Sequence, residues 1–141
     1  MIELRLAELA DCEQVWQWNF APEVRAHSKN PRVVTLAEHA RWYATHIARD
    51  IMWIVEAEGQ PVGVVRLDPE HTGARISIAL AASARGRGIG RHAIALAKSL
   101  WAGPIVAEVS RTNTASCACF EACGFIAART THNLVTYHWS P

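Results

Sequence analysis

Residues 84–91 constrain the fold of this chain more than any other segment, because they read Ala-Arg-Gly-Arg-Gly-Ile-Gly-Arg. An apolar run precedes them at 76–80 and a helix-like run follows at 89–101, so we expect a strand, a tight turn and then a helix. Gly88 and Gly90 allow the backbone to approach a ligand closely, and a helix N-terminus carries unpaired N–H groups and a positive dipole end. The segment therefore predicts a site for a pyrophosphate group, and hence for a nucleotide-like cofactor.

Two familiar phosphate sites do not fit the spacing of these glycines. No Lys-Ser or Lys-Thr pair follows them, which excludes the P-loop of NTPases. The segment lies late in the chain, and no βαβ unit with an acidic ribose partner follows it, which argues against a dinucleotide-binding Rossmann site. A solvated basic turn without a ligand remains the alternative interpretation.

Length, charge and cysteine content limit the class of protein. The 141 residues are expected to form one domain, residues 1–141, and a formal net charge of +1 gives no reason to expect nucleic acid or a membrane as partner. Glu3 and Arg5 interrupt any N-terminal apolar run and no uncharged stretch could span a bilayer, so we expect a cytoplasmic protein. The four cysteines, three of them within 117–123 without a histidine, are interpreted as reduced packing residues, and no metal site is expected.

The periodicity of apolar residues predicts the element order βααβββαβαββ, which is typical of an α/β fold with a mixed sheet and helices on its faces. Helices are expected after Asp11, after Thr35, from Ile89 and after Asn113, the last of which is a good N-cap. The strands are expected at 2–6, 52–57, 62–67, 74–80, 105–109, 125–130 and 134–139. An exposed final strand at 134–139 would allow a homodimer to form by strand pairing.

The helix after Thr35 has the clearest signals in the chain. Thr35 and Glu38 have the form of a capping box. The expected buried stripe comprises Leu36, Ala40, Tyr43 and Ile47, whereas a second stripe of His39, Trp42, His46 and Arg49 is expected to be a solvated flank. Before this helix, Pro22 and residues 28–31 predict a loop.

Two motifs in order resemble the GNAT superfamily of acetyl-CoA-dependent N-acetyltransferases. They are Arg85-x-x-Gly88-x-Gly90 and Asn113-x-x-Ser116-x-x-x-Phe120-Glu121-x-x-Gly124-Phe125. The resemblance covers essentially the whole chain and implies a mostly antiparallel mixed sheet flanked by helices, with acetyl-CoA as co-substrate. It also implies that the strand at 76–80 splays from the strand at 105–109, with the cofactor arm in the gap. The residues that it assigns to the cofactor are Ile78, Ala79, Leu80, Arg85, Arg87, Gly88, Ile89, Gly90, Arg91, Asn113 and Ser116.

The N-terminal half resembles the N-acetyltransferases of nucleotide-linked amino sugars, in particular those of pseudaminic acid biosynthesis. The matching residues are Trp16-x-Trp18-Asn19, Pro22-x-Val24-Arg25 and Glu38-His39-x-x-Trp42. This implies a small-molecule acceptor, the free amine of a nucleotide amino sugar, on whose base or sugar one or two of the aromatic rings would pack while the others fill the core. Two alternatives stay open: acetylation of a protein or peptide N-terminus, and a catalytically silent acyl-CoA-binding domain.

Acyl transfer to an amine needs a general base, and Glu108 is the first candidate because the resemblance sets it on the strand beside the cofactor. The alternative is a carboxylate paired with Arg111 or solvated. Glu56, Asp68, His27 and His39 are lesser candidates on the acceptor side.

The proton donor to the departing thiolate is where the sequence departs from the resemblance. Phe120 stands where many relatives have a tyrosine, and it cannot donate a proton. Tyr137 or Ser116 could take over the role; otherwise water donates, or the thiolate leaves unassisted.

Overall fold

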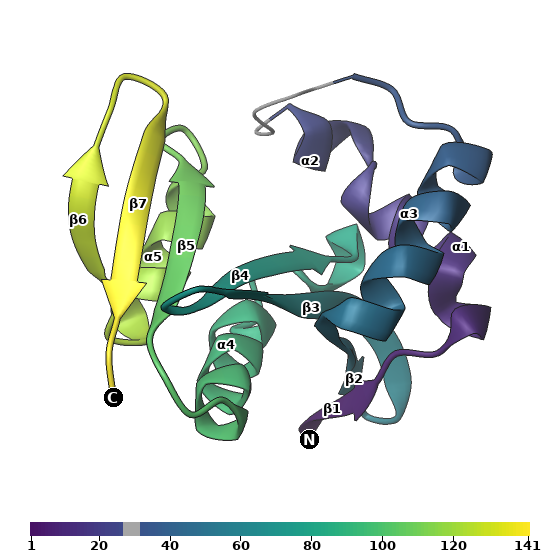
Figure 1. Ribbon diagram of the computed structural model, residues 1–141, viewed down its shortest axis with the longest axis horizontal. Coiled ribbons are helices and arrows are strands. Elements are labelled where there is room, and N and C mark those ends of the chain that lie inside the picture. The colour runs from purple at the N-terminus through teal and green to yellow at the C-terminus, as the bar shows by residue number, and fades with distance from the viewer. Residues whose placement is uncertain (27–31) are drawn as a thin grey trace.

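One antiparallel-rich sheet organises the molecule, whose computed structural model describes residues 1–26 and 32–141 (Figure 1). The described residues form seven strands in the spatial order β1-β2-β3-β4-β5-β7-β6, with β4 and β5 as the parallel pair. The strands are β1 (Ile2–Leu6), β2 (Ile51–Ala57), β3 (Gln60–Glu70), β4 (Gly73–Leu80), β5 (Ile105–Ser110), β6 (Ile126–Thr130) and β7 (Leu134–Trp139). The predicted α/β fold and its strands are confirmed.

The helices cover both faces of this sheet. They are α1 (Cys12–Asn19), α2 (Pro22–Arg25), α3 (Leu36–Arg49), α4 (Ile89–Leu100) and α5 (Thr114–Ala122). Successive side chains of β2 point to opposite faces of the sheet. Met52 and Ile54 therefore pack in one core with α1 and α3, while Trp53 and Val55 pack in the other core with α4 and α5. The two cores meet the two faces of one sheet, which explains why β2 has the continuous apolar sequence of a strand buried on both sides.

The parallel pair is the feature that opens the sheet. Strand β4 pairs with β5 at two positions only, Ala74 with Ile105 and Arg75 with Val106. Beyond Arg75 the two strands diverge, as Figure 1 shows, while β4 stays paired with β3 up to Leu80. The splay that the resemblance implied is confirmed. Its consequence is a wedge in which the β5-facing backbone groups of β4 have no strand partner.

The segment between α1 and α3 differs from the prediction. A one-turn helix, α2, begins at Pro22, because proline at the first helical position has its backbone angle already set and its missing N–H is not needed there. The loop predicted at 28–31 and the candidate His27 lie outside the described residues. The prediction for Asp11 is corrected in part: it precedes α1, but its carboxylate accepts from the Glu8 N–H (2.8 Å) and from Arg5 instead of capping α1.

Helix α3 begins with the predicted capping box: the Thr35 hydroxyl accepts from the Glu38 N–H (3.1 Å), and the Glu38 carboxylate accepts from the Thr35 N–H. Its predicted buried face is confirmed at Tyr43 and is wrong at Leu36, Ala40 and His39. Leu36 and Ala40 are exposed, whereas His39 and Tyr43 are almost fully buried. His39 and Tyr43 are buried because they hydrogen-bond backbone carbonyls. The His39 ring bonds the Cys12 carbonyl (3.0 Å), and the Tyr43 hydroxyl donates to the Glu8 carbonyl (2.7 Å). Apolar Leu36 and Ala40 could not satisfy those carbonyls.

The prediction of a dimer through the final strand is also corrected. Strand β7 pairs with β5 on one side and with β6 on the other, so it is not an edge. The edge strand next to it is β6, all of whose residues are exposed.

Candidate active site

Two adjoining cavities lie at the divergence of β4 and β5. The larger has a volume of about 670 Å³ and the smaller about 360 Å³. Ile78 and Ala79 of β4 line both cavities, as do Asn113 and Ser116 at the start of α5. Because they share a wall, molecules entering from the two sides would meet at the gap between the strands.

The smaller cavity is built on the glycine-rich turn and the N-terminus of α4. Gly88 is the N-cap of α4 and has a left-handed backbone (φ +77°), a conformation that glycine adopts without strain. The first helix-closing bond runs from the His92 N–H to the Gly88 carbonyl (3.1 Å), so the N–H groups of residues 89–91 have no partner within the helix. Leu80, Gly88, Ile89 and Gly90 all line this cavity. The turn therefore has the geometry of an anion-binding helix N-terminus.

The three predicted arginines around this turn have different positions. Arg85 lines the smaller cavity, where it pairs with Glu23 of α2 (3.1 Å) and donates to the Leu80 carbonyl (2.9 Å). Arg87 and Arg91 are exposed and lie outside the lining of both cavities. Arg85 thus fixes α2 against the end of β4, while the other two contribute positive charge near the turn.

Asn113 performs the capping role that its position predicted. Its side chain accepts a hydrogen bond from the Ser116 N–H (3.2 Å), which starts α5 at the shared wall. The Ser116 side chain lies at that same wall. Capping of α5 and contact with a ligand in the gap are therefore compatible roles for this pair.

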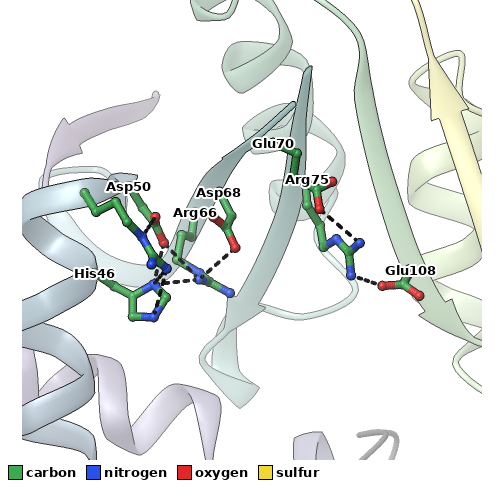
Figure 2. A network of polar contacts seen from close by, with 8 residues as sticks. His46, Asp50, Arg66, Asp68, Glu70, Arg75 and Glu108 are labelled. Atoms are coloured by element: carbon green, nitrogen blue, oxygen red, sulfur yellow. Dashed lines mark hydrogen bonds and ion pairs between the residues drawn. The ribbon is translucent and has the colours of Figure 1, made fainter. Parts of the chain in front are cut away.

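Glu108 projects from β5 into the larger cavity, and Arg75 of β4 donates a hydrogen bond to it (Figure 2). The expected alternative partner, Arg111, is therefore replaced by Arg75. Arg75 also pairs with Glu70 (3.2 Å), so one guanidinium bridges two carboxylates, of which only Glu108 lines the cavity. The arrangement fixes a carboxylate at the point where the two strands begin to diverge.

Phe120 and Tyr137 stack with ring centroids 6.2 Å apart, and both are buried. Phe120 lines the larger cavity, whereas Tyr137 is not part of the lining described for either cavity. The Tyr137 hydroxyl donates to Glu121 (2.6 Å), and burial together with this hydrogen bond raises the pKa of Tyr137. Its role as proton donor stays a prediction that this position does not favour. Ser116 is the better placed of the two predicted donors.

Of the lesser base candidates that the structure describes, His39 alone lines the larger cavity. It was predicted on a solvated flank, but burial lowers its pKa and keeps the ring neutral. Glu56 pairs with Arg5 (3.1 Å), and Asp68 lies 3.9 Å from Arg66, both outside the lining of the cavity.

The sequence analysis named Arg25 and Trp42 of the larger cavity through the resemblance, but it missed Arg32, Arg41, Arg66 and Phe20. Trp42 is half-buried there, stacked on His46 (4.4 Å between centroids), with the Arg66 guanidinium 5.0 Å from its ring. Figure 2 shows the buried carboxylate of Asp50 accepting from His46 (2.6 Å) and Arg66 (3.0 Å). Burial alone would raise the pKa of Asp50, but these hydrogen bonds outweigh it and lower the pKa. The i, i+4 spacing of His46 and Asp50 was the available signal; their pairing with a strand residue was not visible in it.

Residues 2–126 match the acetyltransferase (GNAT) domain family, and the chain therefore belongs to this family. The predicted class, an acetyl-CoA-dependent N-acetyltransferase, is confirmed at the level of the family.

Solved structures support the fold. A domain from Methanocaldococcus jannaschii is 22% identical, with a TM-score of 0.85 over 100% of this chain and 99% of that one. Spermidine N-acetyltransferase from Vibrio cholerae, in complex with CoA and spermine, is 20% identical, with a TM-score of 0.82 over 99% and 95%. Ribosomal-protein-alanine N-acetyltransferase from Brucella melitensis is 23% identical, with a TM-score of 0.80 over 99% of both chains. No curated protein sequence matches the chain significantly.

Two further findings concern the described residues alone. The four cysteines are free, and residues 1–26 and 32–141 hold no group of three or more His, Cys, Asp or Glu side chains placed to bind a metal ion. No helix within those ranges is long and apolar enough to cross a membrane.

Proposed function

We propose that this chain transfers the acetyl group of acetyl-CoA to the primary amine of a nucleotide-linked amino sugar, in the cytoplasm. The observation that carries the proposal is the pair of adjoining cavities at the divergence of β4 and β5. Their shared wall, formed by Ile78, Ala79, Asn113 and Ser116, is where a thioester from one side would meet an amine from the other.

The smaller cavity suits the cofactor. The free N–H groups at the start of α4 and the close backbone at Gly88 and Gly90 would hold the pyrophosphate, with Arg85 at the rim and the charges of Arg87 and Arg91 nearby. Strand β4 pairs with β5 only as far as Arg75, so the backbone N–H groups of Ile78 and Leu80, which alternation directs away from β3, would bond the pantetheine arm and polarise the thioester carbonyl. Acetyl-CoA supplies the activated acetyl group.

Glu108 is proposed as the general base. An amine attacks only after it loses its proton, and Glu108 faces the cavity from which the amine would approach. Arg75 orients the carboxylate through its hydrogen bond. Proton transfer would run to Glu108 directly or through one water.

Phe120 has no hydroxyl to offer the departing thiolate, and among the described residues that line both cavities the one hydroxyl is that of Ser116. Ser116 is the proposed donor. A thiol with a pKa of about 8.5 also leaves without full protonation, so the contribution of Ser116 is expected to be modest.

The acceptor is inferred from the size and lining of the larger cavity. Its volume of about 670 Å³ lies in the range typical of small-molecule sites. Phe20 and Trp42 provide aromatic surface on which a sugar or a base could pack. The resemblance to amino-sugar N-acetyltransferases at residues 16–42 falls on the elements that form this cavity.

The test is release of CoA thiol from acetyl-CoA with a panel of amines: UDP-linked 4-amino sugars, peptides with free N-termini, and polyamines. We expect turnover with the UDP-linked sugars. Glu108→Gln should lower kcat about 100-fold, because general-base catalysis typically contributes that much or more. Glu70→Gln is the matched control, since Glu70 also bonds Arg75 but does not line the cavity.

Other outcomes would redirect the proposal. Turnover with peptides alone would assign the chain to acetylation of protein N-termini. Tight acetyl-CoA binding with no turnover on any amine would identify a silent acyl-CoA-binding domain.

A further inference from the structure

We propose that the acceptor amine carries a phosphate group and that Arg25, together with Arg41, binds this group in the larger cavity. The inference rests on the proposed function, because it concerns the acceptor of the same acyl transfer. It states which part of that acceptor the protein recognises, its phosphate, and names the side chains that bind it.

The lining of the larger cavity is cationic. Its charged residues, within the part of the chain that the structure describes, are four arginines and two glutamates: Arg25, Arg32, Arg41, Arg66, Glu38 and Glu108. His39 adds no negative charge and stays neutral because it is buried. A cavity of this kind attracts anions, whereas a polycation entering it would meet like charges.

Two of the four arginines have their positive charge compensated by a nearby carboxylate. Arg32 pairs with Glu38 (3.0 Å), and Arg66 pairs with the buried Asp50 (3.0 Å). Arg25 and Arg41 have no ion pair with any carboxylate in residues 1–26 and 32–141. Two uncompensated arginines in one cavity match the charge of a phosphate monoester, which is about −1.5 to −2 at neutral pH.

Arg25 is the stronger candidate of the two for binding the phosphate, because its guanidinium has an N–H donor without an acceptor among the described residues. Its Nε is buried and has no hydrogen-bond partner within the described ranges, while its Nη2 donates to the Arg32 carbonyl (3.2 Å). The guanidinium lies 4.8 Å from the Phe20 ring, which also lines the cavity. Burial and the neighbouring Arg32 lower the pKa of Arg25, so the surroundings disfavour its charge until an anion arrives.

A phosphate oxygen would satisfy this donor and neutralise this charge together. The planar guanidinium presents its N–H groups in a fixed fork that fits two oxygens of one phosphate. A buried donor without a partner destabilises the free protein, so part of the binding energy comes from relieving that cost. A hydroxyl of a neutral sugar could accept from this donor but could not neutralise the guanidinium charge, and the ammonium groups of a polyamine can do neither.

The experiment compares matched acceptors that differ only in charge: a free 4-amino sugar, its 1-phosphate, the UDP-linked form, a 4-amino uronic acid and spermidine. We expect both phosphorylated acceptors to have the higher kcat/KM. If the 1-phosphate has a raised kcat/KM, the arginines bind a terminal phosphate. If only the UDP-linked form has a raised kcat/KM, they bind the diphosphate of the nucleotide. Equal use of the free sugar, or preference for the uronic acid or spermidine, would overturn the proposal.

Two variants assign the effect to named residues. Arg25→Gln is expected to lower kcat/KM for the phosphorylated acceptor about 10- to 100-fold, mainly through KM, because a hydrogen bond to a charged group is lost. Its rate with the free amino sugar and its affinity for acetyl-CoA should stay within about twofold. Arg41→Gln should act in the same direction and lies on an exposed helix surface, so it tests the proposal if Arg25→Gln does not fold. Arg129→Gln, on the far strand β6, is the control.

Calorimetric binding of the UDP-linked amino sugar separates this inference from the proposed function. Binding that is lost in Arg25→Gln supports the phosphate site even where no acetyl transfer occurs, in which case the proposed function alone fails. Turnover that is unchanged in Arg25→Gln and Arg41→Gln would overturn the phosphate site and leave the proposed function standing.

Discussion

The same substitution, glycine to alanine, is expected to have opposite effects on the free energy of unfolding at two positions of the glycine-rich turn, residues 84–91. At Gly88 nothing lies within 4 Å of an added Cβ, so space does not prevent a side chain. The backbone, however, is left-handed (φ +77°), and an L-residue in that conformation costs about 1–2 kcal/mol. Gly88→Ala should therefore destabilise the fold by about that amount or shift the turn.

Gly90 provides the contrasting case. It lies in the first turn of α4, where an added Cβ would meet Leu80 Cδ1 at 3.4 Å and Cys119 Sγ at 3.7 Å, both ordinary contacts. Alanine is favoured over glycine in a helix by up to about 1 kcal/mol, less at a helix end. Gly90→Ala should therefore be neutral or stabilising, by up to about 1 kcal/mol.

Urea unfolding gives both free energies, and calorimetry gives the affinity of each variant for CoA. For a chain of this length a loss of 1–2 kcal/mol lowers Tm by about 4–10 °C. We expect Gly88→Ala to lose CoA affinity with its stability, whereas Gly90→Ala should keep its stability but weaken CoA binding, because its Cβ would lie beside Leu80 and Cys119, which line the smaller cavity. If Gly88→Ala unfolds like the wild type and binds CoA equally well, the left-handed N-cap is not what requires glycine, and our account of the turn is wrong.

Three further predictions test the elements around the larger cavity. Thr35→Ala should cost about 1 kcal/mol in urea unfolding by removing the capping box of α3, whereas Thr45→Ala in the exposed middle of that helix should cost little. Asp50→Asn should cost about 1.5–3 kcal/mol at pH 7. Because folding lowers the pKa of Asp50, this stability is present above its unfolded value of about 4 and is lost as pH falls through the folded pKa, so the two unfolding curves should converge in acid; a constant difference would contradict the reasoning. Tyr137→Phe should lower Tm by breaking the bond to Glu121 yet keep kcat within about twofold, and a large loss of kcat would make Tyr137 the proton donor.

The cofactor side of the site was predictable from sequence because local rules govern it. The turn at residues 84–91 needs glycine for its backbone and arginine for its charge, and Asn113 caps the helix that follows it. These requirements act over a few residues, so spacing alone reveals them. The strands were predictable for the same reason, from alternation and from turn residues.

The acceptor side was not predictable, because tertiary contacts decide it. Helical spacing gave α3 two candidate stripes, but the buried face combines Tyr43 of the apolar stripe with His39 of the other stripe. His39 and Tyr43 are buried because the carbonyls of Cys12 and Glu8, some 30 residues away in sequence, need donors at that place.

Glu108 depends both on the local sequence pattern and on tertiary contacts. The sequence alone determined that a carboxylate follows two small apolar residues on a buried strand, and the resemblance placed this strand beside the predicted cofactor. Only the tertiary structure decided that β4 stops pairing with β5 after Arg75, so that Arg75 holds Glu108 and Arg25 shares its cavity. A local pattern specifies the backbone conformation of its own residues, whereas the charge and shape of a cavity depend on which distant segments the fold packs around it.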